Sequence, residues 1–349
     1  MADPDLTLTL INVPDLSPAD DNFVCLQNKK LVWKRLSGLA SNWFERAVKK
    51  PRISRYRAAL SAVIHARASR ASVVISHLPR MSAAVSFFSG LIAPEARHVA
   101  FSFNFTQLPG GLSRRWFSFV LRRVDKIFVY SSYELNLYSK YFGIRDDKFA
   151  SVLWTQDAPP VVEPDEPVFH EPYLCAIGGE GRDFGCLIEA ARASGLPLLV
   201  IARPHSLAGL DIPANVKVLT NIPLAKTWGL AVKSAGVVVP LLSSDTCCGQ
   251  ITVVSAQLLG LPLLTAPCKA LAEYIDGAPG VLLYEFNSSQ SLAEKMSSML
   301  VNAQVYKDAA VLNMENAKHK YRRAVWAEAI EKCLDEFYPA SPLQKGGLS

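Results

Sequence analysis

Three polar loops in the second half of the 349-residue chain carry residue types suited to binding an anion. The first, Gly178-Gly179-Glu180-Gly181-Arg182-Asp183, follows the apolar run YLCAI. Its glycines allow close approach to the backbone, and Arg182 lies where the next helix begins, a position suited to a phosphate. The spacing matches neither GxGxxG nor GxxxxGK[ST], so neither a dinucleotide fingerprint nor a P-loop is indicated.

The other two loops also follow apolar, strand-like runs. Asn221-Ile222-Pro223 comes after VKVLT, and Ser243 to Thr252 comes after GVVVPL and includes Ser244. Within it, Gly249-Gln250-Ile251-Thr252 opens a helix whose free N–H groups would point at an anion. A glycine-rich turn between strand and helix is more often structural than functional. Three such loops on corresponding strands of one domain nevertheless favour a nucleotide diphosphate site.

The elements that must position these loops alternate between short apolar strands and helices, which is typical of a parallel, doubly wound sheet. The alternation stops at TQDAPPVVEPDEPVFHEP (155–172), which contains five prolines and five acidic residues. We therefore predict an N-terminal domain over 1–154, a Pro-rich linker over 155–172 and a C-terminal donor domain over 173–320. A helix over 321–338 is expected to pack back on the first domain, followed by a mobile tail over 339–349. Ligands of such folds bind at the carboxyl ends of the strands.

Basic charge is concentrated in the first third of the chain. Residues 29–126 hold 19 Lys and Arg and only three acidic residues, a net +16, and because the whole chain carries +6 the remainder carries −10. In LSRRWFSFVLRRVDK the arginines flank aromatic residues at helical spacing, which is typical of a helix lying on an anionic bilayer. An ordinary solvated surface is the alternative. No RNP motif, zinc finger or recognition helix is present, so no nucleic-acid partner is predicted.

The compartment is expected to be cytoplasmic. Met1 to Asp5 is acidic and unlike a secretory leader, and seven cysteines without a CxxC pair favour reduced core thiols over disulfides or a zinc site. The run 243–267 has one charge, but Gly260, Pro262 and polar residues interrupt it, so it does not span a membrane. With the basic first domain, we expect a protein peripheral to the inner face of the plasma membrane.

The second half resembles the donor-binding domain of GT-B glycosyltransferases, nearest to the large retaining group called glycosyltransferase family 4. AIGGEGRDFGCLIEAA resembles that family's strand, Gly-Arg/Lys loop and Leu-Ile-Glu-Ala-Ala helix. VVVPLLSSDTCCGQITVVSAQLLGLPLLTAP resembles its strand ending in Pro, Gly-rich turn, Glu-Ala helix and Gly-x-Pro-Val-Val strand. The resemblance covers roughly residues 172 to 302. It implies an α/β fold of two Rossmann-like domains that face each other across a cleft.

The resemblance also implies roles for individual residues. Arg182 lines up with a lysine that binds the donor diphosphate and would stabilise the departing diphosphate, and Gly249–Thr252 matches the segment that holds the phosphates and sugar. The family's Glu-x7-Glu signature is replaced by Cys247 and Ser255. Because the second Glu binds the ribose, Ser255 or Gln250 would do so more weakly, donor recognition has changed, or activity is lost. A catalytically inactive assembly partner is therefore an alternative to an enzyme.

In the first domain the candidates lie at strand ends. His77 ends SVVISHL and is a candidate base, although a hydrogen-bonded structural histidine is equally compatible with its position. Asn104 and Gln107 follow the next strand and are candidate acceptor-side contacts. The expected function is metal-independent, retaining transfer from a nucleotide diphosphate sugar, with no cofactor. The expected acceptor is a lipid-linked saccharide in bacterial exopolysaccharide or surface polysaccharide assembly.

Overall fold

The structure, a computed structural model, describes residues 7–15, 31–48, 50–69, 71–246 and 249–338 and forms two compact units. The first unit comprises the chain to Leu153 together with the segment from Arg323 onward, and the second comprises Trp154–Arg322. The tail predicted over 339–349 lies outside the described residues. No described helix is long and apolar enough to cross a bilayer.

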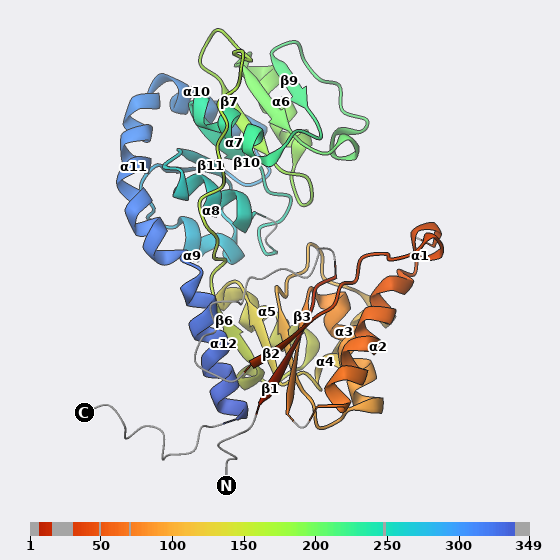
Figure 1. Cartoon of the computed structure of the whole chain (residues 1–349). Helices are drawn as coiled ribbons and strands as arrows, with labels where there is room; N and C mark the ends of the chain where they lie inside the picture. Colours follow the sequence, from red (N-terminus) through yellow and green to blue (C-terminus); the bar gives the residue numbers. More distant parts are fainter. Residues whose placement is uncertain (1–6, 16–30, 49, 70, 247–248, 339–349) are drawn as a thin grey trace, which may run out of the picture. The chain divides into compact units, whose positions relative to one another are not determined.

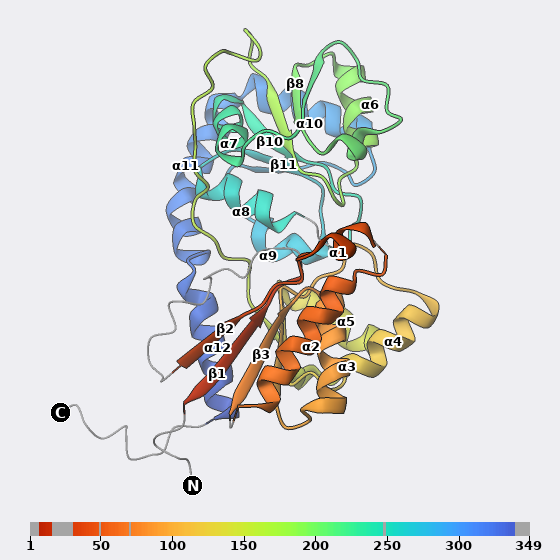
Figure 2. The same cartoon turned by 45° about the vertical axis from the view of Figure 1, so that its right-hand side comes forward.

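The first unit is built on a six-stranded parallel sheet in the order β2-β1-β3-β4-β5-β6. Helices cover the sheet (Figures 1 and 2). The strands are β1 (Leu8–Val13), β2 (Leu31–Arg35), β3 (Ser72–His77), β4 (Arg97–Phe101), β5 (Lys126–Val129) and β6 (Phe149–Ser151). The helices are α1 (Trp43–Ala47), α2 (Ile53–Arg67), α3 (Pro79–Ile92), α4 (Gly111–Leu121), α5 (Ser132–Phe142) and α12 (Ala324–Phe337), with a 3-10 turn η1 (Asp146–Lys148).

The second unit holds another six-stranded parallel sheet, in the order β12-β11-β10-β7-β8-β9. Its strands are β7 (Leu174–Ile177), β8 (Leu198–Ile201), β9 (Val216–Leu219), β10 (Gly236–Val239), β11 (Leu263–Thr265) and β12 (Val281–Leu283). Its helices are α6 (Phe184–Ser194), α7 (Leu224–Lys233), α8 (Gln250–Leu258), α9 (Ala272–Ile275), α10 (Ser289–Val301) and α11 (Ala303–Lys320), with 3-10 turns η2 (Pro204–Leu207) and η3 (Lys269–Leu271).

The central strands of the second sheet, β10 and β7, are apolar throughout. All four residues of β8 and of β10 are buried, as expected for parallel strands covered on both faces. Helix α5 shows how local sequence sets an element's ends. Ser131 accepts a hydrogen bond from the Glu134 backbone N–H at its start, and Gly143 ends it in the left-handed conformation (φ 62°).

The C-terminal helix α12 belongs to the first unit. The Trp326 ring packs edge-on against Phe101 at 4.9 Å between centroids and stacks on Tyr130 at 6.4 Å. Its indole N–H donates to the Leu153 carbonyl at 2.9 Å, and the Tyr338 hydroxyl donates to the Ser72 carbonyl at 3.2 Å. The chain thus enters and leaves the second unit once each, and its final helix completes the first unit.

The Pro-rich segment over 155–172 has no regular secondary structure but is held on the second unit. The Val162 N–H donates to the Ala225 carbonyl at 3.0 Å, and Lys233 pairs with Glu163. Gly229 of α7 lies directly beneath this segment, because a Cβ atom at 229 would stand 1.8 Å from the Val162 carbonyl oxygen. The segment therefore belongs to the second unit.

Candidate functional site

The loops after β7 and β10 meet at the carboxyl edge of the second sheet. The chain runs from β7 to β8 on one side, whereas β10 lies on the other side of β7, so the order reverses between β7 and β10. Such a reversal leaves an open crevice at the carboxyl ends of the two strands, where ligands of doubly wound sheets bind. An antiparallel bridge between Arg182 and Leu241 ties the two loops together at this point.

The glycine loop is shaped around the Arg182 side chain. Gly178 has a φ of 144°, which side-chain-bearing residues rarely adopt, and a Cβ atom there would stand 2.7 Å from Arg182 Nε. The guanidinium therefore lies against the backbone of residue 178. Asp183, the next residue, accepts a hydrogen bond from the Cys186 N–H at 2.9 Å and so caps α6.

Arg182 reaches the start of α8. Its Nη2 donates to Thr252 Oγ1 at 3.1 Å, which joins two of the three loops predicted from the sequence. No side chain caps α8, whose N-cap is Gly249. Gln250 is only 5% exposed, and its Nε2 has no hydrogen-bond partner in the described part of the chain. The Arg182 guanidinium and the uncapped N–H groups of α8 therefore lie together, with a buried amide donor on the first residue of that helix, an arrangement suited to a polyanion.

A second cation, Arg203, was missed by the sequence analysis. It follows β8, the neighbour of β7, and its Cδ would lie 3.3 Å from a Cβ atom at Gly179. Its Nη1 pairs with Glu180 Oε1 at 3.2 Å, and His205 Nε2 lies 3.5 Å from the same oxygen. The run VIARPH gives no signal by itself, because the role of Arg203 depends on β8 pairing beside β7.

The polar loop after β10 is organised by its own side chains. Ser243 Oγ accepts hydrogen bonds from the backbone N–H groups of Asp245 and Thr246, and the Ser244 carbonyl accepts from the Lys269 N–H at 2.8 Å. Asp245 forms an ion pair with Lys269 at 2.8 Å. The described residues contain no group of three or more His, Cys, Asp and Glu side chains arranged to hold a metal ion.

The remaining donor-site candidates are placed differently. Ile251 is exposed, whereas Ser255 is 1% exposed and its hydroxyl accepts a hydrogen bond from Gln156 Nε2 at 2.7 Å. Asn221 and Pro223 are exposed after β9, two strands from β7 and so about 10 Å along the sheet edge. Within the described residues, no hydrogen bond or ion pair connects Asn221 or Pro223 to Arg182. Cys247, the other departure from the Glu-x7-Glu pattern, lies outside the described residues.

In the first unit, His77 ends β3 beside a strained backbone. Leu78 has φ 72° and Ser102, just after the adjacent β4, has φ 52°; non-glycine residues in this region cluster at functional sites. His77 Nε2 lies 2.7 Å from Asn12 Oδ1, and since that oxygen only accepts, Nε2 carries the proton. Burial lowers the pKa of His77 to about 4, so its ring is neutral at pH 7.

The acceptor-side candidates follow β4. Phe103 and Phe105 are buried in an aromatic cluster, and Asn104 between them is half-buried while Gln107 is exposed. The alternation places Asn104 on the face of the loop opposite the core. Within the described ranges, no hydrogen bond joins Asn104 or Gln107 to His77.

A second buried histidine, His98, makes a pH-dependent contribution to stability. His98 Nε2 lies 2.8 Å from Ser76 Oγ, which donates to Ser82 Oγ at 2.9 Å, and burial lowers the His98 pKa to about 3. Below the ordinary histidine pKa of about 6.5 the unfolded chain takes up a proton that the folded chain refuses, so stability falls as pH falls.

We expect the free energy of unfolding between pH 6.5 and 5 to depend less steeply on pH in His98→Gln than in the wild type. The difference in slope should approach about 1.4 kcal/mol per pH unit. Urea titrations at several pH values measure it, and equal slopes would contradict the assignment even if the variant is less stable overall.

Comparison with known proteins rests on structure, because no family model and no curated protein matches the sequence. A glycosyltransferase from Rickettsia africae superposes with a TM-score of 0.68 at 11% identity, over 97% of this chain and 100% of that chain. HepE of Anabaena in complex with UDP-glucose gives 0.70 at 13% identity, over 94% and 99%. Sucrose-phosphate synthase from Thermosynechococcus elongatus gives 0.70 at 12% identity, over 96% and 100%.

Structural similarity at 11–13% sequence identity establishes the fold of the chain. The matches extend over nearly the whole of both chains and include both parallel sheets. The predicted α/β class with two Rossmann-like sheets is confirmed, and so is the predicted resemblance: the chain has the GT-B fold of glycosyltransferases.

Proposed function

We propose that the chain is a glycosyltransferase that moves a sugar from a nucleotide diphosphate sugar to an acceptor. The observation that carries the proposal is the hydrogen bond from Arg182 to Thr252 at the reversal point of the second sheet, beside the uncapped start of α8. The similar HepE structures contain UDP or UDP-glucose, which are ligands of the matching charge.

The chemistry follows from where charge develops. When the bond between the anomeric carbon and the diphosphate oxygen breaks, negative charge builds on the leaving diphosphate. Arg182 and the N–H groups of α8 are positioned before the reaction and would stabilise that charge by several kcal/mol. We propose transfer without a metal ion, since Asp183 caps α6 and Asp245 pairs with Lys269. We also propose a retaining outcome, which the resemblance to a retaining family implies.

For the acceptor we propose a lipid-linked saccharide, with His77 taking the proton of its hydroxyl and with Asn104 and Gln107 as neighbouring contacts. The neutral ring of His77 can accept that proton, although its low pKa makes it a weak base. The lipid is supported by α4, where Leu112 (81% exposed) and Phe119 (63%) lie on one helix face beside Arg115 and Arg122. We therefore place the protein on the cytoplasmic face of an anionic membrane, in surface polysaccharide assembly.

An inactive GT-B partner protein is the second candidate. Ser255 is buried against Gln156 and so offers less to a ribose than an exposed glutamate would. This candidate predicts nucleotide binding without turnover, or neither.

A screen of nucleotides by thermal unfolding tests the donor site. We expect one nucleoside diphosphate, at 100 times its dissociation constant, to stabilise the protein by about 2.7 kcal/mol, and the corresponding monophosphate to do less at equal concentration. Turnover is then measured with the matching nucleotide sugar and membrane extract as acceptor. Binding without turnover would favour the inactive partner, and no binding of any nucleoside diphosphate would refute the donor site.

A further inference from the structure

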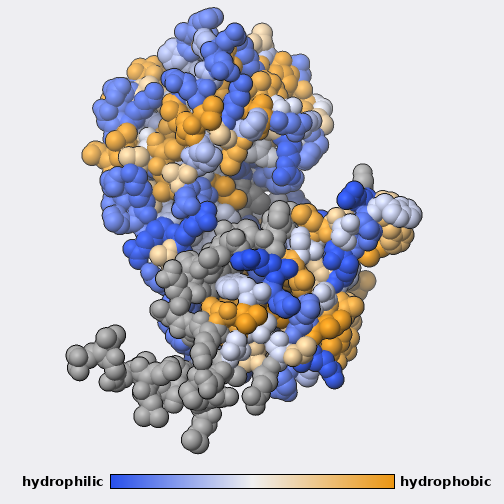
Figure 3. Space-filling model, in the orientation of Figure 1, coloured by the Kyte–Doolittle hydropathy of each residue, from blue (hydrophilic) through white to orange (hydrophobic). Residues whose placement is uncertain are grey.

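Helix α1 presents two aromatic rings to solvent at the edge of the first unit. Trp43 is 78% exposed and Phe44 51% exposed, and their rings contact edge-on at 6.0 Å between centroids. Figures 1 and 2 show α1 at the N-terminal end of α2, and Figure 1 shows it projecting from the body of the unit. Figure 3 shows apolar and hydrophilic surface side by side at this tip. Exposed aromatic pairs of this kind mark interaction sites more often than ordinary surface.

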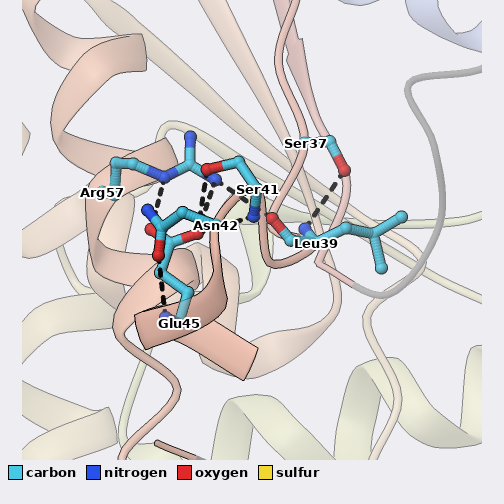
Figure 4. Close-up of polar contacts among 6 residues, drawn as sticks. All are labelled: Ser37, Leu39, Ser41, Asn42, Glu45 and Arg57. Carbon is cyan, nitrogen blue, oxygen red and sulfur yellow. Dashed lines mark hydrogen bonds and ion pairs between the residues drawn. The ribbon is translucent and has the colours of Figure 1, made fainter. Parts of the chain in front are cut away.

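The loop that carries the two rings is braced from below (Figure 4). Asn42 accepts a hydrogen bond from the Glu45 N–H at 2.9 Å, and Glu45 accepts from the Ser41 N–H at 2.7 Å. Arg57 of α2 donates to Glu45 at 2.6 Å and to the Leu39 carbonyl at 3.0 Å. These contacts from Arg57 and Ser41 lower the pKa of Glu45 to about 2.

The brace fixes a helix too short to be stable by itself. An isolated five-residue helix does not persist in water, so the geometry of α1 depends on Asn42, Glu45 and Arg57. Because the loop is ordered in the folded protein, little conformational entropy remains to be lost when the rings engage a partner.

The charge around α1 is almost entirely positive. Residues 31–48 and 50–57 contain seven Lys and Arg and one acidic residue, Glu45, which pairs with Arg57. Buried Arg55 pairs with Asp15 and adds no surface charge. Arg46 and Lys50, next to the rings in sequence, are exposed. Exposed aromatic rings among basic side chains match the interface of an anionic bilayer, where indole rings lie at headgroup level and basic residues meet acidic lipids.

We propose that α1 is a preformed wedge that inserts Trp43 and Phe44 into the headgroup region of an anionic membrane, with the Glu45–Arg57 pair as its brace. The proposal rests on the membrane association proposed above. It adds α1 as a second membrane contact, separate from the contact through α4. The competing explanation is that Trp43 and Phe44 contact a second copy of this chain.

Co-sedimentation of the full chain with vesicles tests the wedge. We expect the wild type to bind vesicles of phosphatidylglycerol and phosphatidylcholine, and Trp43→Ser with Phe44→Ser to lower the partition coefficient at least about tenfold, since two rings lose their burial. The matched control, Val305→Ser with Leu312→Ser on α11, removes exposed apolar side chains (66% and 76%) from the second unit and should bind like the wild type.

The brace has its own test. Glu45→Gln with Arg57→Gln leaves the net charge and both aromatic rings unchanged, so a roughly threefold or larger loss of vesicle binding would report the order of the loop. Far-UV circular dichroism, measured in parallel without vesicles, should be unchanged in all three variants and shows that they fold, and unchanged nucleotide binding checks the second unit.

The outcomes separate the two proposals. If the wild type and the Trp43→Ser/Phe44→Ser variant bind vesicles equally well, the wedge is wrong but membrane association stands. If the wild type self-associates and this variant does not, the rings contact a second copy of the chain, and the wedge is likewise wrong. A wild type that binds no anionic vesicles would overturn the membrane assignment as well, while leaving the nucleotide site to its own measurement.

Discussion

Replacing Arg182 with alanine is expected to weaken nucleoside diphosphate binding roughly 10- to 100-fold, because a hydrogen bond to a charged group contributes about 1.5 to 3 kcal/mol. The Arg182 side chain is held between the Gly178 backbone and Thr252, so its positive charge is fixed beside the free N–H groups at the start of α8. Turnover should fall further, since the interaction strengthens as the leaving group gains charge. Isothermal titration with the diphosphate found in the screen, and initial rates, measure the two effects.

The control is Arg192→Ala, which removes an arginine of α6 that pairs on the surface with Glu189 and Asp211. It should leave affinity and turnover unchanged. Arg203→Ala should have a smaller effect than Arg182→Ala, because Arg203 is 65% exposed and already shares Glu180 with His205. Unchanged affinity and turnover in Arg182→Ala would show that the phosphates bind elsewhere.

Replacing Gly229 with alanine is expected to destabilise the second unit by about 1 to 3 kcal/mol or more, the usual cost of overpacking. The added methyl group would stand 1.8 Å from the Val162 carbonyl oxygen, which is backbone and cannot rotate away. The segment over 155–172 must shift, and the hydrogen bond from Val162 to Ala225 would be strained or lost. Urea unfolding and hydrogen exchange of the segment measure the effect.

Gly185→Ala is the matched control for Gly229→Ala. Gly185 is also helical, in α6, but a Cβ atom there would meet only Asp183 Oδ1, at an ordinary 3.5 Å. This substitution should be neutral or stabilise by up to about 1 kcal/mol through helix propensity. If Gly229→Ala behaved in the same way, the segment would not pack on α7 as described.

The sequence predicted the parts whose causes are local. Alternating apolar strands and helices predicted two parallel sheets, which the structure contains, and the glycine loop and the turn before α8 were predicted to share a diphosphate site, which stays a prediction. The loops meet because β10 pairs with β7, a pairing between distant strands that the alternation of strands and helices does not specify.

The parts that the sequence did not predict depend on contacts between distant residues. Arg203 joins the glycine loop only because β8 pairs with β7, and the Ser255 hydroxyl is covered because Gln156, 99 positions earlier, lies over α8. The brace beneath α1 is likewise invisible in sequence, since Arg57 is one of many basic residues in that region. Periodicity carries no information about such pairings.

The return of α12 to the first unit constrains the order in which the two units can finish folding during synthesis. Phe101 and Tyr130 receive Trp326, which leaves the ribosome about 200 residues after them, behind the entire second unit. During synthesis the first sheet therefore waits with an uncovered aromatic surface while its partner is still being translated. Vectorial folding from the N-terminus can complete the second unit before the first, and α12 then covers the aromatic side chains of the first unit.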